Sequence, residues 1–344
     1  MRLATVITTA RDAGGGPATR AAVQSGDHFV LLAAQDLSEL LETAGWQEQA
    51  AAAAEEAAGG VPHGSIPVED ARFATVLPRP SKVICCGLNY ADHIAEMGRE
   101  LPEYPTLFAK YADTLIGDGE VIDAAGHGAR LDWEAELAVV VGAPLKNASP
   151  EEASAAIAGY TVANDISMRD WQSRTLQWFQ GKAFDRTTPL GPVLVTPDEC
   201  DPEAGVRVRC LVNGEEVQNG NTKTLVFTAA ALLSYISTFT RLSPGGCGLL
   251  RVEDAFLRSL HPGRAGEHCG VSQDSPHAAW LDELQDVGDL AFVRRDNGAA
   301  YAFGRTLHGL AEFQRLCGLV GELDPLAGCC GDLRSALDGG RTHV

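Results

Sequence analysis

Three carboxylates and one lysine in this chain have the types and spacing of a small metal-assisted active site. Glu134 and Glu136 stand two residues apart, Asp165 follows in a second motif, and Lys182 comes soon after it. Carboxylates with no cysteine or histidine among them offer only oxygen ligands, which suit a hard cation such as Mg²⁺. A nearby lysine suits an anionic substrate or intermediate. The sequence therefore predicts an enzyme that acts on a small organic acid.

The two glutamates fall on a predicted strand, because the apolar run 137–141 that follows them has the composition of a buried strand. Residues two apart on a strand point to the same face, so their carboxylates repel each other unless a cation lies between them. An edge strand with solvated acids is the alternative. Asp165 favours the metal site, because it ends the strand-like run 160–163 and adds a third oxygen ligand. About three positions of an octahedral Mg²⁺ would remain for water and a bidentate keto-acid.

Lys182 lies in a segment rich in Gly and Pro, which predicts a loop that fixes its ammonium group. Such a lysine could act as an electrostatic clamp on a carboxylate or developing enolate, and a surface lysine is the alternative. His93 and Glu96 are three residues apart, which makes them neighbours on a helical turn. Glu96 could therefore orient His93 as a general base, although a structural or solvated histidine fits the same spacing.

Arg169 and Gln172 follow the third carboxylate closely. Three roles are open to them. They could bind substrate, they could brace the metal ligands from behind, or they could form an ion pair within their own loop.

Short strands dominate the predicted structure after residue 78, which favours an α+β fold over a doubly wound parallel sheet. Asn213 and Gly214 predict a hairpin turn. Helix starts are predicted at Ser149, which precedes Pro150, and near Phe227. The predicted elements are strands over 83–87, 137–141, 159–163, 193–195 and 206–210, and helices over 149–158 and 227–236.

Three regions follow from this pattern. Residues 1–77 are predicted to form a small N-terminal α/β domain, with strands at 6–9 and 28–32 and one helix over 37–58. The catalytic domain would cover 78–300. The remaining residues, 301–344, are predicted to be a weakly ordered tail.

Composition excludes several classes of partner. The 344 residues carry a net charge of −19, which disfavours binding to nucleic acid or to an anionic membrane. No apolar stretch approaches the roughly 18 residues of a membrane span. The nine cysteines are odd in number and lack zinc-site spacing, and the apolar run at the start is too short for a secretion signal. We therefore expect a reduced, cytoplasmic protein that binds a small anionic substrate.

The chain resembles the fumarylacetoacetate hydrolase family, in its acylpyruvate hydrolase-like and 2-hydroxyhepta-2,4-diene-1,7-dioate isomerase-like branch. The resemblance is strong over about 82–245 and looser over the first 80 residues. Its carrying segments occur in the family order: Gly87-Leu88-Asn89-Tyr90-Ala91-Asp92-His93, Pro105-Thr106-Leu107-Phe108-Ala109-Lys110, Asp132-Trp133-Glu134-Ala135-Glu136-Leu137, Asn164-Asp165-Ile166-Ser167-Met168-Arg169-Asp170-Trp171-Gln172 and Gly181-Lys182-Ala183-Phe184-Asp185.

This resemblance implies a mixed β-roll or barrel-like catalytic core behind a small N-terminal domain, usually in homodimers. It implies Mg²⁺ or Mn²⁺ held by Glu134, Glu136 and Asp165. It further implies that His93 with Glu96 activates water and that Lys182 stabilises an oxyanion, while Lys110 looks like the residue before a lid that closes over substrate. The predicted site therefore consists of the metal ligands Glu134, Glu136 and Asp165, the catalytic residues His93, Glu96 and Lys182, and the substrate-binding residues Lys110, Arg169 and Gln172.

Three functions are consistent with this site. The first is a metal-dependent hydrolase that cleaves a carbon–carbon bond of a 2,4-diketo acid of the acylpyruvate type, giving pyruvate and a carboxylic acid. The second keeps the metal but decarboxylates an oxaloacetate-type acid, or hydrates or isomerises a 2-keto acid. The third is an inactive relative that only binds keto-acids.

Residues 246–281 depart from the family pattern. Relatives continue after the position of Gly245 with an acidic residue, an apolar strand and a Thr-Gly-Thr-Pro turn that contacts substrate. Here 246–250 is Gly-Cys-Gly-Leu-Leu and no such turn follows. We expect the strand that completes the core to be missing and 259–279 to be loop. Either the segment has been rebuilt for another substrate, or a change of reading frame has replaced the original end.

Overall fold

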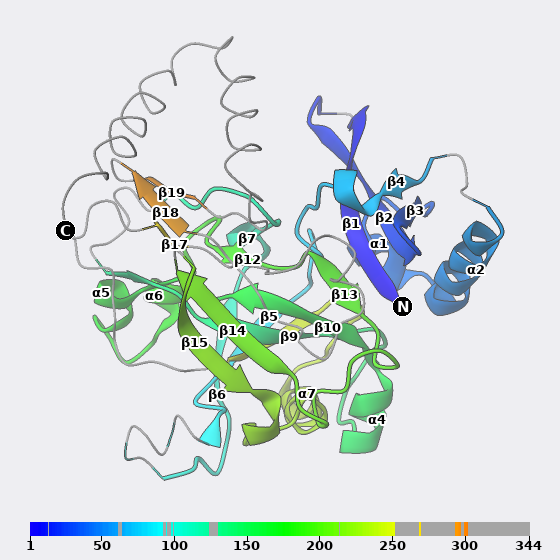
Figure 1. Ribbon diagram of the computed structural model, residues 1–344. Helices are drawn as coiled ribbons and strands as arrows, with labels where there is room; N and C mark the ends of the chain where they lie inside the picture. Colours follow the sequence, from blue (N-terminus) through cyan, green and yellow to red (C-terminus); the bar gives the residue numbers. More distant parts are fainter. Residues whose placement is uncertain are drawn as a thin grey trace, which may run out of the picture. The chain divides into compact units, whose positions relative to one another are not determined.

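The structure is a computed structural model that describes residues 1–12, 14–60, 64–91, 94, 98, 100–123, 130–212 and 214–251. Beyond these it describes the backbone of three strands, β17 (His268–Cys269), β18 (Val293–Asp296) and β19 (Ala299–Tyr301). Helices and strands are mixed along the chain, so the α+β fold class is confirmed (Figure 1). The predicted loop at 259–279 and the predicted tail fall almost entirely outside the described residues.

The main sheet of the described chain has ten strands in the order β4-β3-β2-β1-β13-β10-β9-β16-β5-β6. All neighbouring strands are antiparallel except β16 and β5. Their bounds are β1 (Arg2–Arg11), β2 (Pro17–Ser25), β3 (His28–Leu31), β4 (Ile66–Pro67), β5 (Val83–Gly87), β6 (Thr106–Lys110), β9 (Ala135–Val141), β10 (Ile157–Asn164), β13 (Val193–Val195) and β16 (Cys247–Arg251).

Smaller strand pairs and short helices surround this sheet. The pairs are β7 (Leu115–Ile116) with β12 (Thr188–Pro189), β8 (Leu131–Asp132) with β11 (Ser167–Met168), and β14 (Arg207–Val212) with β15 (Glu215–Asn221). The helices are α1 (Leu37–Glu42), α2 (Trp46–Ala58), α4 (Pro150–Ala155), α5 (Arg169–Gln172), α6 (Phe179–Lys182) and α7 (Ala229–Phe239), with 3₁₀ turns η1 (Val68–Asp70), η2 (Ala112–Thr114) and η3 (Thr222–Thr224).

The prediction of one helix over 37–58 is wrong, because the chain leaves the helical conformation between α1 and α2. Thr43 is extended, with φ −81° and ψ 126°, and Gly45 has φ 74°, a left-handed conformation that glycine adopts without strain. The start of α4 is confirmed. Ser149 accepts a hydrogen bond from the Glu152 N–H, and the Glu152 side chain accepts one from the Ser149 N–H, which is a complete capping box.

The expectation that a strand is missing after Gly245 is wrong for the backbone. Residues of β16 pair with β9 on one side and with β5 on the other, with Leu249 opposite Ala138 and Cys85. The turn before it is held by Gly245, whose N–H donates to the Val141 carbonyl at 2.8 Å. A strand ladder is made by main-chain groups, so a changed sequence can still fill this position in the sheet.

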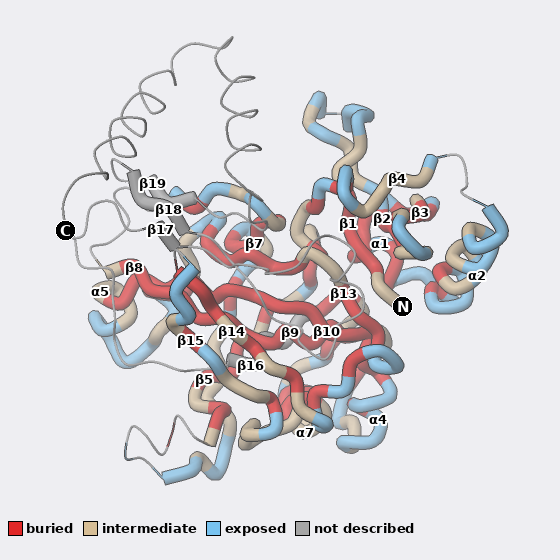
Figure 2. Tube along the Cα trace, viewed as in Figure 1, coloured by how far each residue is buried: buried red, intermediate tan, exposed pale blue. Residues whose placement is uncertain are grey.

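Two central strands of the described chain are buried along their whole length. Every residue of β9 and β10 is buried, and the tube in Figure 2 is red along both. Helix α7 covers this region with Leu232, Leu233 and Ile236, which pack in one apolar cluster with β9 side chains such as Val139. A charged side chain on β9 therefore lies in a low-dielectric environment, where it needs a partner of opposite charge.

The N-terminal strands continue the main sheet through the pairing of β1 with β13, in which Leu3 lies opposite Leu194. The division of the chain at residue 77 stays a prediction. Within the described part of the chain, no helix combines the length and the apolar character that crossing a membrane requires.

Candidate metal centre

Strand register brings the three carboxylates together. In the β9–β10 pair, Glu136 lies opposite Ala163 and Ala135 lies opposite Asn164. One step further along, Asp165 follows β10 and Glu134 precedes β9. The Asp165 N–H donates to the Glu134 carbonyl at 2.8 Å, which ties the two residues together through their backbones.

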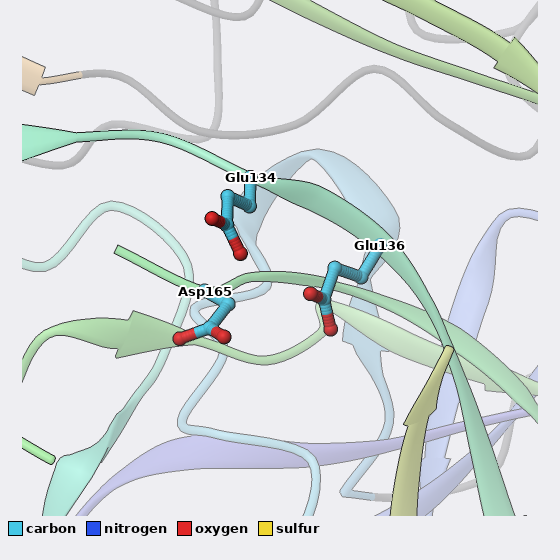
Figure 3. A group of neighbouring side chains, drawn as sticks. All are labelled: Glu134, Glu136 and Asp165. Atoms are coloured by element: carbon cyan, nitrogen blue, oxygen red, sulfur yellow. The ribbon is translucent and has the colours of Figure 1, made fainter. Parts of the chain in front are cut away.

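The three side chains point toward one another, two from the segment that enters β9 and one from the end of β10 (Figure 3). One carboxylate oxygen from each of Glu134, Glu136 and Asp165 lies within 4.8 Å of the others. All three residues are buried. Oxygens that share one divalent cation at roughly 2.0–2.5 Å are separated by at most about 4–5 Å, so this oxygen-only set fits a hard divalent metal.

Two buried lysines contact the same carboxylates. Lys182 Nζ lies 3.0 Å from Asp165 Oδ2 and also donates to Glu134 Oε2. Lys110 Nζ donates to Asp165 Oδ1. Both ammonium groups are completely shielded from solvent. Their positive charge lowers the electrostatic cost of holding several carboxylates in a buried site.

Arg169 braces the carboxylates from a third direction. Its Nη2 lies 2.5 Å from Glu134 Oε1, its Nε donates to Asp132 Oδ2 at 2.7 Å, and its Nη1 donates to Gln172 Oε1 at 2.7 Å. Burial opposes the charge on this guanidinium, but Glu134 and Asp132 outweigh it and raise the pKa of Arg169. Arg169 is therefore a permanent cation of the site.

Side-chain amides hold the backbone between the two glutamates. Asn164 Oδ1 accepts the Glu134 N–H at 2.9 Å. Gln218 Oε1 accepts the Ala135 N–H at 2.8 Å, and Gln218 Nε2 donates to the Ala135 carbonyl at 2.9 Å. The metal-ligand candidates thus stand on a backbone segment whose polar groups are paired.

A buried thiol lies beside the cluster. Burial, followed by the nearby charges of Asp165 and Glu136, raises the pKa of Cys85 well above its ordinary value. A thiol must lose its proton to bind a metal strongly, so Cys85 stays a neutral neighbour of the oxygen ligands.

The alternatives considered from the sequence can now be compared with the structure. The edge-strand alternative is wrong, since β9 lies between β10 and β16 and Glu136 has no exposed surface. Lys182 is likewise not on the surface, and it ends helix α6 instead of lying in a loop. Arg169 contacts the carboxylates of Asp132 and Glu134, and Gln172 accepts a hydrogen bond from Arg169, while substrate binding by either residue stays a prediction. His93 and Glu96 lie outside the described residues, so their proposed dyad is a prediction from the sequence alone.

Three contributors to the site received no role from the sequence. Asp132, which pairs with Arg169, and Asn164, which accepts the Glu134 N–H, both stand inside the recognised motifs. Gln218 is 83 residues from its partner Ala135. The sequence gives little sign of this role, because Gln218 is one of several polar residues in a strand where Val217 is the one large apolar residue.

Comparison with known proteins gives a consistent result. Residues 82–247 match the sequence profile described as Fumarylacetoacetate (FAA) hydrolase C-terminal. A rat protein (Rattus norvegicus) named oxaloacetate tautomerase Fahd2a, mitochondrial, is 40% identical over 203 residues, which are 56% of this chain and 65% of that protein. The match therefore spans a little less than two thirds of that relative's length.

Solved structures with a similar fold include two proteins named as hydrolases. Fumarylacetoacetate hydrolase from psychrophilic Exiguobacterium antarcticum aligns with a TM-score of 0.61 and 28% identity, over 74% of this chain and 87% of that chain. Maleylpyruvate hydrolase from Sphingobium sp. SYK-6, in complex with manganese (II) ion and pyruvate, gives a TM-score of 0.61 over 89% of this chain and 99% of that chain. Its identity of 21% supports a likeness of fold alone.

Proposed function

We propose that this chain, whose residues 82–247 belong to the fumarylacetoacetate hydrolase family, is a metal-dependent enzyme that converts short 2-keto acids through their enolates. The observation that carries the proposal is the buried cluster of Glu134, Glu136 and Asp165 with the Lys182 ammonium in contact with two of its members. Such a set can hold a divalent cation and place a fixed positive charge beside a developing oxyanion.

The balance of buried charge supports this assignment. Seven side chains of the site that carry a carboxylate, ammonium or guanidinium group are buried in the described structure: Asp132, Glu134, Glu136, Asp165, Lys110, Arg169 and Lys182. With all of them ionised, four negative charges face three positive charges, which leaves −1. A divalent cation would change the balance to +1, and the carboxylate of a keto-acid would then neutralise it. A buried site is most stable near neutrality, so the site suits one metal ion with one anionic substrate.

The chemistry divides between the metal and the chain. A divalent cation bound by Glu134, Glu136 and Asp165 would polarise the 2-keto oxygen and so acidify the adjacent carbon. Lys182 stabilises the negative charge that develops on substrate oxygen when that carbon loses its proton. Lys110 holds Asp165 in place and Arg169 holds Glu134, each through an ion pair.

Oxaloacetate tautomerisation is the first candidate reaction. In the enol-to-ketone direction the enol oxygen loses a proton and the neighbouring carbon gains one, so the composition of the substrate does not change and no water attacks it. A stabilised enolate is the central requirement, and the described residues provide for it. The relation to a rat protein named oxaloacetate tautomerase supports this choice.

Hydrolysis of an acylpyruvate is the second candidate, and the Gly87-to-His93 motif favours it. Here water loses a proton to His93, the resulting hydroxide adds to the distal carbonyl, and the carbon–carbon bond breaks. The electron pair of that bond remains on the pyruvate fragment as an enolate, which is then protonated. This reaction needs the His93 and Glu96 dyad in addition to the metal cluster.

The remaining features of the proposal follow the family resemblance. They are a β-roll or barrel-like arrangement of the catalytic core, Mg²⁺ or Mn²⁺ as the cation, and a homodimer. We assign a reducing compartment such as the cytoplasm, because Cys85, Cys86, Cys200 and Cys210 are all buried free thiols.

The test uses purified full-length protein with Mg²⁺, with Mn²⁺ or with EDTA. Enol-oxaloacetate and acetylpyruvate are supplied separately, and loss of the enol absorbance and release of pyruvate are followed. We expect metal-dependent conversion of at least one substrate and its loss in Glu136→Gln. The His93→Ala variant distinguishes the candidates, since it should retain enol–ketone conversion but lose cleavage of acetylpyruvate. Folded wild-type protein that converts neither substrate with either metal would overturn the proposal.

A further inference from the structure

Among the described residues, the backbone of Ala135 has a strand on only one side. Asn164 of β10 lies opposite it, while the described register of β16 on the other side ends with Arg251 opposite Glu136. The Ala135 N–H and C=O face that second side, and the side-chain amide of Gln218 pairs with both, at 2.8 and 2.9 Å. One side chain thus continues the hydrogen-bond ladder one residue beyond the last described pair of β16 and β9, at the residue that separates two ligand candidates.

A bulge in the β14–β15 hairpin directs the Gln218 side chain toward Ala135. Gln218 lies on β15 opposite Cys210, whereas Leu211 pairs with Glu216, so Val217 is an extra residue on that strand. A bulge of this kind changes the direction of neighbouring side chains. Val217 packs against the apolar cluster that contains Ala135, and Gln218 beside it is only 2% exposed. The bulge therefore turns two consecutive residues toward the same core.

A buried amide in an apolar cluster is costly unless all its hydrogen-bonding groups are used. Here both groups are used on a single backbone residue that joins Glu134 to Glu136. Fixing the backbone at Ala135 limits rotation between the two glutamates, which in turn limits the distance between their carboxylates. Groups that orient metal ligands in this way commonly change metal affinity by about 10- to 100-fold.

We infer that Gln218 is a positioning residue of the metal centre, which holds Glu134 and Glu136 at the separation that a divalent cation requires. This inference rests on the proposed metal site and adds to it a residue from a separate hairpin. Its two described hydrogen bonds are to the Ala135 backbone, and it acts on the two glutamates through that residue.

Asn89 offers a matched control. Asn89 is 1% exposed, and its side-chain amide makes an equivalent pair of hydrogen bonds to one backbone residue. Asn89 Oδ1 accepts the Phe227 N–H at 2.8 Å, and Asn89 Nδ2 donates to the Phe227 carbonyl at 3.0 Å. Gln218→Met and Asn89→Leu remove equivalent pairs of hydrogen bonds at nearly constant side-chain volume. Only the first pair supports the ligand strand.

The experiment measures Mn²⁺ binding to full-length protein by the electron paramagnetic resonance signal of free Mn²⁺, together with thermal unfolding in EDTA. We expect both variants to lose thermal stability, and Gln218→Met alone to raise the Kd for Mn²⁺ by about tenfold or more. Equal Mn²⁺ affinity of Gln218→Met and wild type, or an equal loss in both variants, would overturn the inference and leave the metal site intact. Absence of Mn²⁺ binding in folded wild type would instead remove the metal site and the inference with it. If Gln218→Met does not fold, Gln218→Asn is measured against the same outcomes, since it keeps the amide but shortens its reach.

Discussion

Arg169 supplies a positive charge that two buried carboxylates of the site share. It contacts Asp132 and Glu134 at once, and its fork of N–H donors also reaches Gln172. Breaking a buried ion pair by removing one partner is costly, because the remaining charge stays in a low-dielectric environment. An exposed ion pair has no such penalty, since water solvates whichever charge remains.

Replacing Arg169 by Met should lower the free energy of unfolding by about 3–5 kcal/mol, because two buried carboxylates lose a shared cation. Urea unfolding in EDTA measures this loss. The matched control is Arg207→Met, which breaks a half-exposed pair with Glu216 and should cost less than about 1 kcal/mol. Added Mn²⁺ should reduce the loss in Arg169→Met by supplying positive charge. Equal losses in the two variants would contradict burial of the Arg169 pairs.

At the scale of elements, two very short helices determine where Lys182 stands. Helix α6 ends at Lys182, and Gly181 just before it lies against Gln172, the last residue of α5. A Cβ atom at Gly181 would lie 2.5 Å from the Gln172 Cβ and 2.6 Å from the Gln172 backbone nitrogen. Backbone cannot move aside as a flexible side chain can, so any larger residue must displace α6 and the ammonium that follows.

Gly181→Ala should therefore reduce kcat/KM by about tenfold or more through displacement of Lys182. It should also lower stability by about 1–3 kcal/mol, which is typical of overpacking. Gly59→Ala is the control, because its added Cβ would have its nearest neighbour at an ordinary 3.4 Å and Gly59 has a negative φ of −81°. Steady-state kinetics and urea unfolding of both variants provide the measurement. If Gly181→Ala behaves like Gly59→Ala, α6 does not fix the position of Lys182.

Features that depend on neighbouring residues could be predicted from the sequence, whereas pairings between distant residues could not. Ser149 with Glu152 predicts the start of α4, and the alternation around Glu134 and Glu136 predicts a shared face, since both depend on neighbouring residues. The strand β16 was not predicted, because its place is set by β5 and β9 and not by its own composition. The contact of Gln218 with Ala135 could not be predicted either, because the residues around Gln218 do not indicate a partner 83 residues away.

At the scale of the whole molecule, the outer charge and the site charge have opposite consequences for an anionic substrate. The chain has a net charge of −19, so the field around it repels a keto-acid. Under the proposed function, the buried site with a divalent cation bound would attract the same molecule at close range. Salt screens exposed charges much more than buried ones, and the Debye length falls from about 30 Å at 0.01 M to about 8 Å at 0.15 M.

Raising the ionic strength from about 0.01 M to about 0.15 M should therefore increase kcat/KM for a keto-acid several-fold. The long-range repulsion is reduced, whereas contacts inside the buried site are nearly unchanged. For the same reason kcat itself should change little, because it concerns substrate that is already bound. Steady-state kinetics with KCl at a fixed, saturating metal concentration gives both values, and the metal affinity is measured at each salt concentration. A fall of kcat/KM with salt would mean that local positive charge around Lys110, Arg169 and Lys182 steers the substrate and outweighs the acidic surface.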